Sequence, residues 1–80
     1  MKTKAELDAK LWELYNGGLM PVSLLMHYST YLELAKDVEF FACMHYDIAG
    51  NEYESLAVSF DKTLWPGEIR IETRTRVHGE

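Results

Sequence analysis

The stretch Phe40-Phe41-Ala42-Cys43-Met44-His45-Tyr46 has apolar side chains at both odd and even positions. Because successive side chains of a β-strand point to opposite faces, a strand of this composition needs cover on two sides. The period of two covers residues 38–46, with Val38, Phe40, Ala42, Met44 and Tyr46 on one face and Glu39, Phe41, Cys43 and His45 on the other. The sequence therefore predicts a central strand here, with the rest of the chain arranged around it.

The N-terminal residues show the clearest helical pattern. Thr3 and Glu6 have the spacing of a capping box, and apolar positions then recur at helical intervals, at Leu7, Leu11 and Leu14. The pattern ends at Asn16-Gly17-Gly18, where glycine can take the left-handed conformation common after a last helical turn. We therefore predict a helix that starts after Thr3 and ends before Gly17.

Residues 21–36 admit two interpretations. In the first, Pro21 lies in the opening turn of a second helix whose apolar face is Leu24, Leu25, Tyr28, Tyr31, Leu32 and Ala35. In the second, residues 23–27 form a short strand and Thr30-Tyr31-Leu32-Glu33 caps a separate short helix. We favour the single helix, because six apolar positions on one helical face arise less readily by chance than one local cap.

Two further strands are predicted downstream. Residues 53–60 place Leu56, Val58 and Phe60 on one side, and residues 69–77 alternate Ile, Thr and Val with Arg and Glu. Turn signals at Gly50-Asn51 and Pro66-Gly67 separate the strands. The predicted fold class is α+β, with two N-terminal helices packed on one face of a three-stranded antiparallel β-meander. The alternative is a helix, a strand and a helix followed by three strands.

Length and composition narrow the class of protein. Eighty residues suit a single domain, 1–80, and 48% hydrophobic with 26% charged residues is typical of a folded chain. The formal net charge of -5 opposes general attraction to nucleic acid or anionic lipid. No stretch approaches the ~20 apolar residues that a membrane span needs. Cys43 has no second cysteine with which to form an internal disulfide. We therefore expect a cytoplasmic protein that does not associate with membranes.

The predicted sheet leaves an apolar surface on the side away from the helices. Its side chains are Phe41, Cys43, His45, Tyr53 and Trp65, with an acidic rim of Glu39, Asp47, Glu52 and Glu54. An exposed apolar patch on a small protein is typical of an interface. We hypothesise that the chain forms a homo-oligomer, such as a homodimer, through this patch, and that the acidic rim engages a basic site on a protein partner.

No motif indicates a catalytic, cofactor or metal site. Cys43 and His45 point to the same side of the predicted strand, and His27 could approach them. Structural zinc, however, takes four ligands in recognisable pairs, and activated thiols normally have a third, orienting group. We therefore predict no metal, no cofactor and no enzymatic activity, with Cys43 packed as a small apolar side chain.

Arg70, Arg74 and Arg76 lie on one face of the last predicted strand. Beside aromatic side chains they would form a surface of the kind that stacks single-stranded bases. Glu72 interrupts the row of arginines. Acidic residues on the neighbouring predicted strands are placed to form cross-strand ion pairs with these arginines. Single-stranded nucleic-acid binding is therefore the alternative function. The leading hypothesis is a small acidic protein-protein interaction module that acts as an inhibitor or accessory protein of its partner.

Overall fold

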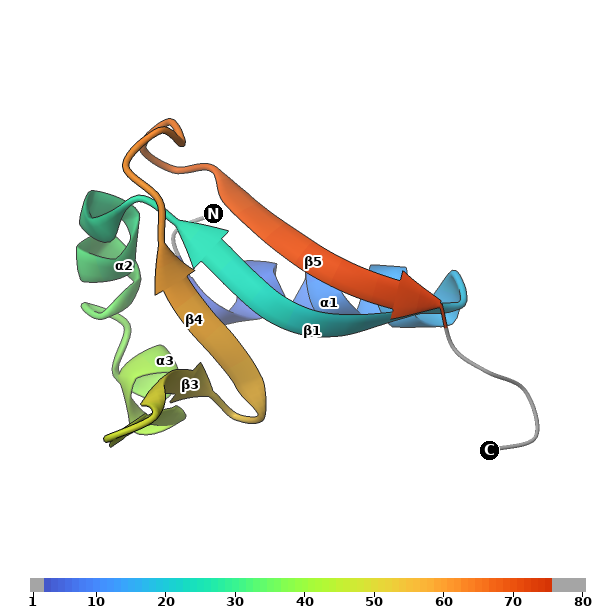
Figure 1. The fold of residues 1–80 in the computed structure, drawn as a ribbon, viewed down its shortest axis with the longest axis horizontal. Coiled ribbons are helices and arrows are strands. Elements are labelled where there is room, and N and C mark those ends of the chain that lie inside the picture. The colour runs from blue at the N-terminus through green and yellow to red at the C-terminus, as the bar shows by residue number, and fades with distance from the viewer. Residues whose placement is uncertain (1–2, 76–80) are drawn as a thin grey trace.

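The computed structural model describes residues 3–75 (Figure 1). Along the chain it contains helix α1 (Lys4–Asn16), strand β1 (Leu19–Met26), helices α2 (Tyr28–Leu34) and α3 (Val38–Ala42), and strands β2 (Met44–Asp47), β3 (Gly50–Tyr53), β4 (Leu56–Phe60) and β5 (Ile69–Thr75). The strands form one five-stranded sheet in the order β2-β3-β4-β1-β5. The sheet is mixed, because β1 runs parallel to β4 and antiparallel to β5.

The helices cover one face of the sheet. In Figure 1, α1 lies behind β1 and β5, and α2 and α3 gather at the end where β3 and β4 lie. The core between the two layers consists of Leu7, Leu24, Met26, Tyr31, Leu34, Phe40, Met44, Tyr53 and Val58. The opposite face carries the alternate side chains of the strands, including Ser23, Leu25, Glu52, Ala57, Ser59, Arg70, Glu72 and Arg74. We call this uncovered surface the open face.

The structure confirms the predicted first helix and both of its ends. The Thr3 hydroxyl accepts a hydrogen bond from the Glu6 N–H at 3.3 Å, as a capping residue does. After the last turn, the Gly17 N–H donates to two helical carbonyls at 3.1 Å, and Gly18 has a positive φ of 89°. Leu7 is fully buried on the face of α1 that meets the sheet.

The predicted fold class is wrong. Within residues 3–75 the structure has a five-stranded mixed sheet, one long helix and two short helices, so neither two helices on a three-stranded meander nor the alternative order describes it. Of the two interpretations of residues 21–36, the strand followed by a separate short helix is the one found. However, α2 begins after a His27 cap rather than at Thr30. Because β1 lies between β4 and β5, both neighbours hydrogen-bond to it, and this stabilises a strand that local helix preference alone does not predict.

Most of the stretch predicted as the central strand is helical instead. Residues 38–42 form the helix α3, which starts where the Asp37 carboxylate accepts a hydrogen bond from the Glu39 N–H at 3.0 Å. Only residues 44–47 are extended, as β2 at the sheet edge. In this short helix Phe40 is 0% exposed in the core, whereas Phe41 is 52% exposed. The two-sided strand from which we inferred self-association therefore does not exist.

The single strand predicted over residues 53–60 is interrupted by a turn, and residues 50–60 form a β-hairpin. β3 ends at Tyr53 and β4 begins at Leu56, with Glu54 and Ser55 in the turn between them. The predicted face of Leu56, Val58 and Phe60 does point toward the helices, because Val58 is buried and Leu56 packs against the core. The alternation predicted for the last strand is confirmed over residues 69–75, where Arg and Glu are exposed and Ile is half-buried. None of the helices within residues 3–75 has the length and apolar character that a membrane crossing requires.

Candidate functional site

The structure does not bring together the residues predicted as one interface. Tyr53 is fully buried, and Cys43 packs against the core at the end of α3. His45 is exposed on β2, next to the buried Met44 and therefore on the opposite side of the sheet. Trp65 is 80% exposed in the connection between β4 and β5. Phe41, on α3, is the one member of this set that joins an aromatic surface, described below.

The predicted acidic rim is likewise spread over the molecule. Glu39 lies on α3, and Asp47 ends β2, where its carboxylate accepts a hydrogen bond from the Ala49 N–H at 2.6 Å. Glu52 lies on the open face, and Glu54 lies in the turn between β3 and β4. These carboxylates therefore do not surround one apolar patch.

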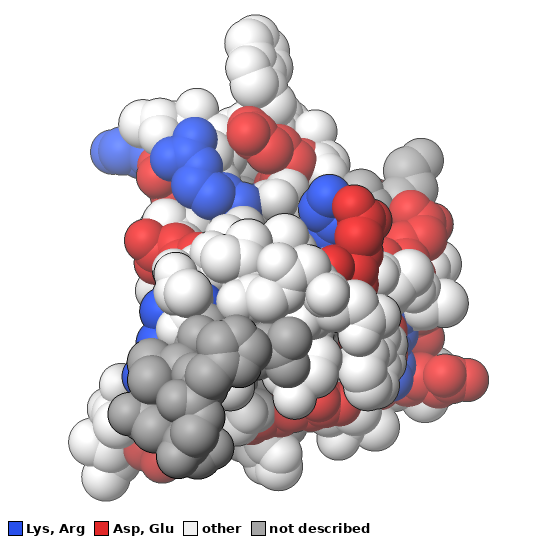
Figure 2. Space-filling model, turned by 90° about the vertical axis from the view of Figure 1, so that its right-hand side faces the viewer, with Lys and Arg blue, Asp and Glu red and all other residues white. Residues whose placement is uncertain are grey.

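Within residues 3–75, the arginine row does not have the buried Tyr53 ring on its face of the sheet. Arg70 and Arg74 share the open face with Glu72, whose carboxylate accepts a hydrogen bond from the Ser23 hydroxyl at 2.5 Å. The Tyr53 ring is stacked in the core on Phe40, with ring centroids 4.9 Å apart. On the side of the described residues that Figure 2 shows, acidic and basic side chains are interspersed and no broad basic surface is visible. Arg76 lies outside the described residues.

Cys43 and the histidines occupy separate places. Cys43 caps α3, His45 lies on β2, and the Nδ1 of His27 accepts a hydrogen bond from the Ser29 N–H at 3.1 Å, capping α2. Over residues 3–75, no three or more His, Cys, Asp or Glu side chains gather in an arrangement that could hold a metal ion. Cys43 and His45 therefore do not share a strand face, which was the geometry that suggested a metal or thiol site.

Five aromatic side chains from four elements form a continuous row, which we call the aromatic strip: Tyr28 and Tyr31 of α2, Phe41 of α3, Tyr46 of β2 and Phe60 of β4. Phe60 meets Tyr28 edge-on at 5.1 Å between ring centroids and meets Tyr31 at 5.3 Å. The hydroxyls of Tyr31 and Tyr46 are hydrogen-bonded to each other. The Tyr46 ring packs beside the Phe41 ring, with 6.3 Å between ring centroids. The row thus runs without a break from the start of α2 to α3.

The aromatic strip is anchored at its centre and open along its length. Tyr31 is 8% exposed, whereas Tyr28, Phe41, Tyr46 and Phe60 are 42–53% exposed. Burial, with a smaller contribution from the hydrogen bond to Tyr46, raises the pKa of Tyr31 to about 12. The raised pKa keeps the Tyr31 phenol protonated, and its hydrogen bond to Tyr46 intact, further into the alkaline range than for an ordinary tyrosine. Large aromatic rings that pack together at a surface are typical of binding sites.

The elements that carry the aromatic strip are also acidic. α2, α3, β2 and β4 contain Glu33, Glu39 and Asp47 and no lysine or arginine. Lys36, between α2 and α3, is paired with Glu33 at 3.2 Å. The formal net charge of -5 of the whole chain would attract a cationic segment toward the molecule.

Sequence reasoning missed this site because its members are far apart in the chain. Tyr28 and Tyr31 were assigned to the buried face of one long helix, and Phe60 to the inside of the sheet. The spacing of Tyr28 and Tyr31 does indicate that they neighbour each other on a helix. Nothing local indicates that Phe60 and Tyr46 complete the row. No protein-family model matches the chain, and neither a curated protein nor a solved structure is significantly similar to it.

Proposed function

We propose that this protein is a non-enzymatic protein-interaction module and that its aromatic strip receives an arginine-containing basic segment of a partner protein. The observation that carries the proposal is the aromatic strip itself: four rings 42–53% exposed, in unbroken contact with a buried fifth ring. Binding of this kind suits an inhibitor or accessory protein that covers a basic site.

The chemistry of the rings supports an arginine-rich occupant. Interfaces are enriched in tyrosine, phenylalanine and arginine, and a guanidinium group stacks favourably on an aromatic face. Each such contact contributes about 0.5–1 kcal/mol at an exposed site. The formal net charge of -5 adds attraction that salt screens.

A peptide pair tests the proposal directly. The first peptide carries four arginines separated by glycine and serine, and the second has citrulline, the uncharged isostere, in place of each arginine. We expect the arginine peptide to bind saturably in calorimetry, with at least about tenfold weaker binding of the citrulline peptide. Tyr46→Ser and Phe60→Ser should each weaken binding of the arginine peptide several-fold.

Two exposed apolar residues outside the aromatic strip provide matched controls. Ile48 and Trp65 are at least 80% exposed, and Ile48→Ser and Trp65→Ser remove apolar surface elsewhere. Both variants should bind the arginine peptide like the wild type. Equal binding of the two peptides, or equal weakening by the control substitutions, would remove the aromatic strip as the site.

The open face supports a second candidate, which is self-association. At its centre, the small side chains of Ser23, Ala57 and Ser59 surround the apolar Leu25, with Ser23 opposite Ala57 and Leu25 opposite Ser59 in the β1–β4 register. Glu52 lies on β3, whereas the edge strand β5 carries Arg70 and Arg74 on either side of Glu72, which leaves a net charge of +1 (two arginines minus one glutamate). A two-fold axis along the strands would place β5 of one copy over β3 of the other, so that opposite charges face each other.

The oligomeric state tests this second candidate. Light scattering after size-exclusion chromatography should then show a dimer at high micromolar concentration. Ala57→Glu, which places a bulky charge at the centre of the open face, should give a monomer, whereas Ile48→Ser should not. A wild-type monomer at every concentration would exclude association through this face.

A further inference from the structure

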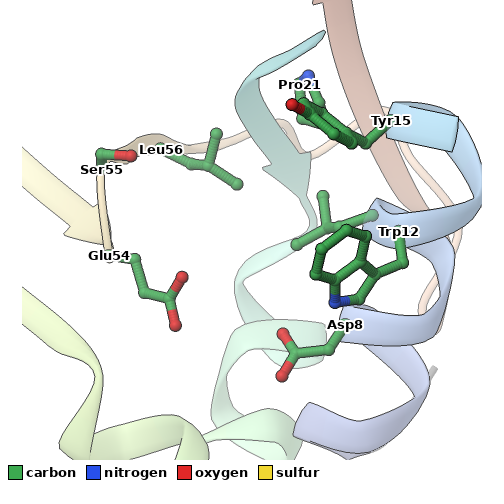
Figure 3. A pocket seen from close by; sticks show the side chains of 8 residues that line it. Asp8, Trp12, Tyr15, Pro21, Glu54, Ser55 and Leu56 are labelled. Atoms are coloured by element: carbon green, nitrogen blue, oxygen red, sulfur yellow. The ribbon is translucent and has the colours of Figure 1, made fainter. Parts of the chain in front are cut away.

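A concave surface site, open to solvent, lies away from the aromatic strip on the helical layer. A cavity of about 420 Å³ opens between α1 and the turn that joins β3 to β4, and it is lined by Asp8, Leu11, Trp12, Tyr15, Pro21, Glu54, Ser55 and Leu56 (Figure 3). Its volume lies in the range of small-molecule sites. None of the aromatic strip residues lines it.

One wall of the cavity is an aromatic corner. Trp12 and Tyr15 lie one turn apart on α1, and their rings stand at 90° with centroids 5.8 Å apart. Trp12 is 63% exposed and Tyr15 39% exposed, and both line the cavity. Two rings at right angles offer π-faces in two directions, as do the aromatic cages that hold quaternary ammonium groups.

Two carboxylates face the cavity from opposite sides. Figure 3 shows Asp8 below the Trp12 indole on α1 and Glu54 reaching toward it from the β3–β4 turn. Asp8 is already partnered, because its oxygens accept hydrogen bonds from the Tyr53 hydroxyl at 2.7 Å and from Lys4 at 2.5 Å. Glu54 forms no ion pair within 4.0 Å among residues 3–75. Lys4 also interacts electrostatically with Glu54, so one ammonium group stands against the two carboxylates and a net negative charge remains.

We propose that this cavity binds a small organic ammonium ion. The Trp12 and Tyr15 rings would contact the alkyl groups of the ammonium centre, and Glu54 would balance its charge. The apolar floor of Leu11 and Leu56 accepts the hydrocarbon part of such a ligand. An anion would face the Glu54 carboxylate, and a small hydrated metal ion would gain little from the rings, so this lining favours a bulky, weakly hydrated cation.

Choline and its uncharged carbon isostere, 3,3-dimethylbutan-1-ol, test the proposal. They have the same shape and differ in charge. We expect choline, titrated at constant ionic strength, to shift the Trp12 indole and the Glu54 and Ser55 amide signals saturably in NMR spectra. The alcohol should bind at least about tenfold more weakly, because it lacks the cation–π and ionic contributions.

Matched variants separate this site from a general charge effect. Glu54→Gln and Trp12→Leu should each weaken choline binding about tenfold. Glu52→Gln removes the same charge from the neighbouring strand, and Trp65→Leu removes the other indole, so both should leave choline binding unchanged. The proposal is overturned if choline gives no saturable shift up to tens of millimolar, if both probes bind equally, or if Glu52→Gln weakens choline as much as Glu54→Gln. The test does not depend on the aromatic strip, so it can succeed or fail separately from the proposed function.

Discussion

At the residue scale, Glu54 combines a left-handed backbone conformation with a carboxylate that lines the α1 cavity. Among residues 3–75 it is the non-glycine residue with a positive φ, 56°. The left-handed conformation costs an ordinary L residue about 1–2 kcal/mol relative to the right-handed one. Strain of this kind is often found at functional positions. Glycine would suit the turn better, so the side chain at this position is not explained by the fold.

We therefore expect Glu54→Gly to stabilise the protein while it weakens choline binding. Relief of the strained φ should exceed the added freedom of the unfolded chain and raise the free energy of unfolding by about 0.5–1 kcal/mol. Urea denaturation at neutral pH measures this. Ser55→Gly, in the same turn without a positive φ, should not stabilise. A less stable Glu54→Gly variant would contradict the assignment of strain.

Tyr31 predicts a loss of stability at alkaline pH. Burial raises its pKa from 10.0 to about 12, so the folded state favours the protonated phenol. This stabilisation is fully present below pH 10 and is lost as the pH rises through about 12. The free energy of unfolding should fall above pH 10, with at most ~1.4 kcal/mol per pH unit from this group. In denaturation series at increasing pH, Tyr31→Phe should show a shallower decline, although Tyr53, whose pKa burial also raises, still contributes.

At the element scale, α3 shows how a local cap outweighs a strand-like pattern. The Asp37 carboxylate accepts hydrogen bonds from the Lys4 N–H at 2.9 Å and from the Glu39 N–H at 3.0 Å. It thereby starts α3 and ties it to the first turn of α1. Phe40 can then enter the core and stack on Tyr53, while Phe41 stays at the surface. The alternating pattern of residues 38–46 predicted none of these contacts.

Adjacent phenylalanines give a direct test of this helix. Phe40→Ala should lower the free energy of unfolding by about 3–5 kcal/mol, because it opens a cavity among buried rings. Phe41→Ala should change it by no more than about 0.5 kcal/mol, as is usual for an exposed side chain. If Phe40→Ala does not fold, Phe40→Leu keeps the comparison measurable. Similar losses for both positions would indicate a strand buried on two sides.

Asp37 predicts a loss of stability in acid. The hydrogen bond from the Lys4 N–H, with a further bond from the Glu39 N–H, lowers the pKa of Asp37 below its ordinary value of 3.8. Its stabilising contribution is therefore present above pH 3.8 and is lost as the pH falls through the lowered pKa. Asp37→Ala should be less stable than the wild type at neutral pH, and the difference should shrink in acid. A constant difference across this range would contradict the role of the carboxylate.

At the scale of the whole molecule, the aromatic strip and the α1 cavity have no lining residue in common. Substitutions at distant sites without shared partners usually act additively. Trp12→Leu should therefore leave binding of the arginine peptide unchanged, and Tyr46→Ser should leave choline binding unchanged. Calorimetry and NMR titration of each variant with both probes measure this. Cross-effects larger than about twofold would show that the two sites are coupled.

The sequence by itself determined the features whose causes are local. The Thr3 cap and the glycines after Asn16 set the two ends of α1. The alternation of residues 69–75 separates a solvent-exposed face of β5 from a face that packs on the helices. Residues 21–36 admitted two interpretations, and residues 38–42 were wrongly predicted as strand, since leucine and phenylalanine suit either a helix or a strand. For residues 19–26 only the tertiary structure decided, because strand hydrogen bonds come from β4 and β5, more than thirty residues away in the register. The same distance explains the aromatic strip and the cavity: their members come from separate elements, and only packing of the helices on the sheet brings those side chains together.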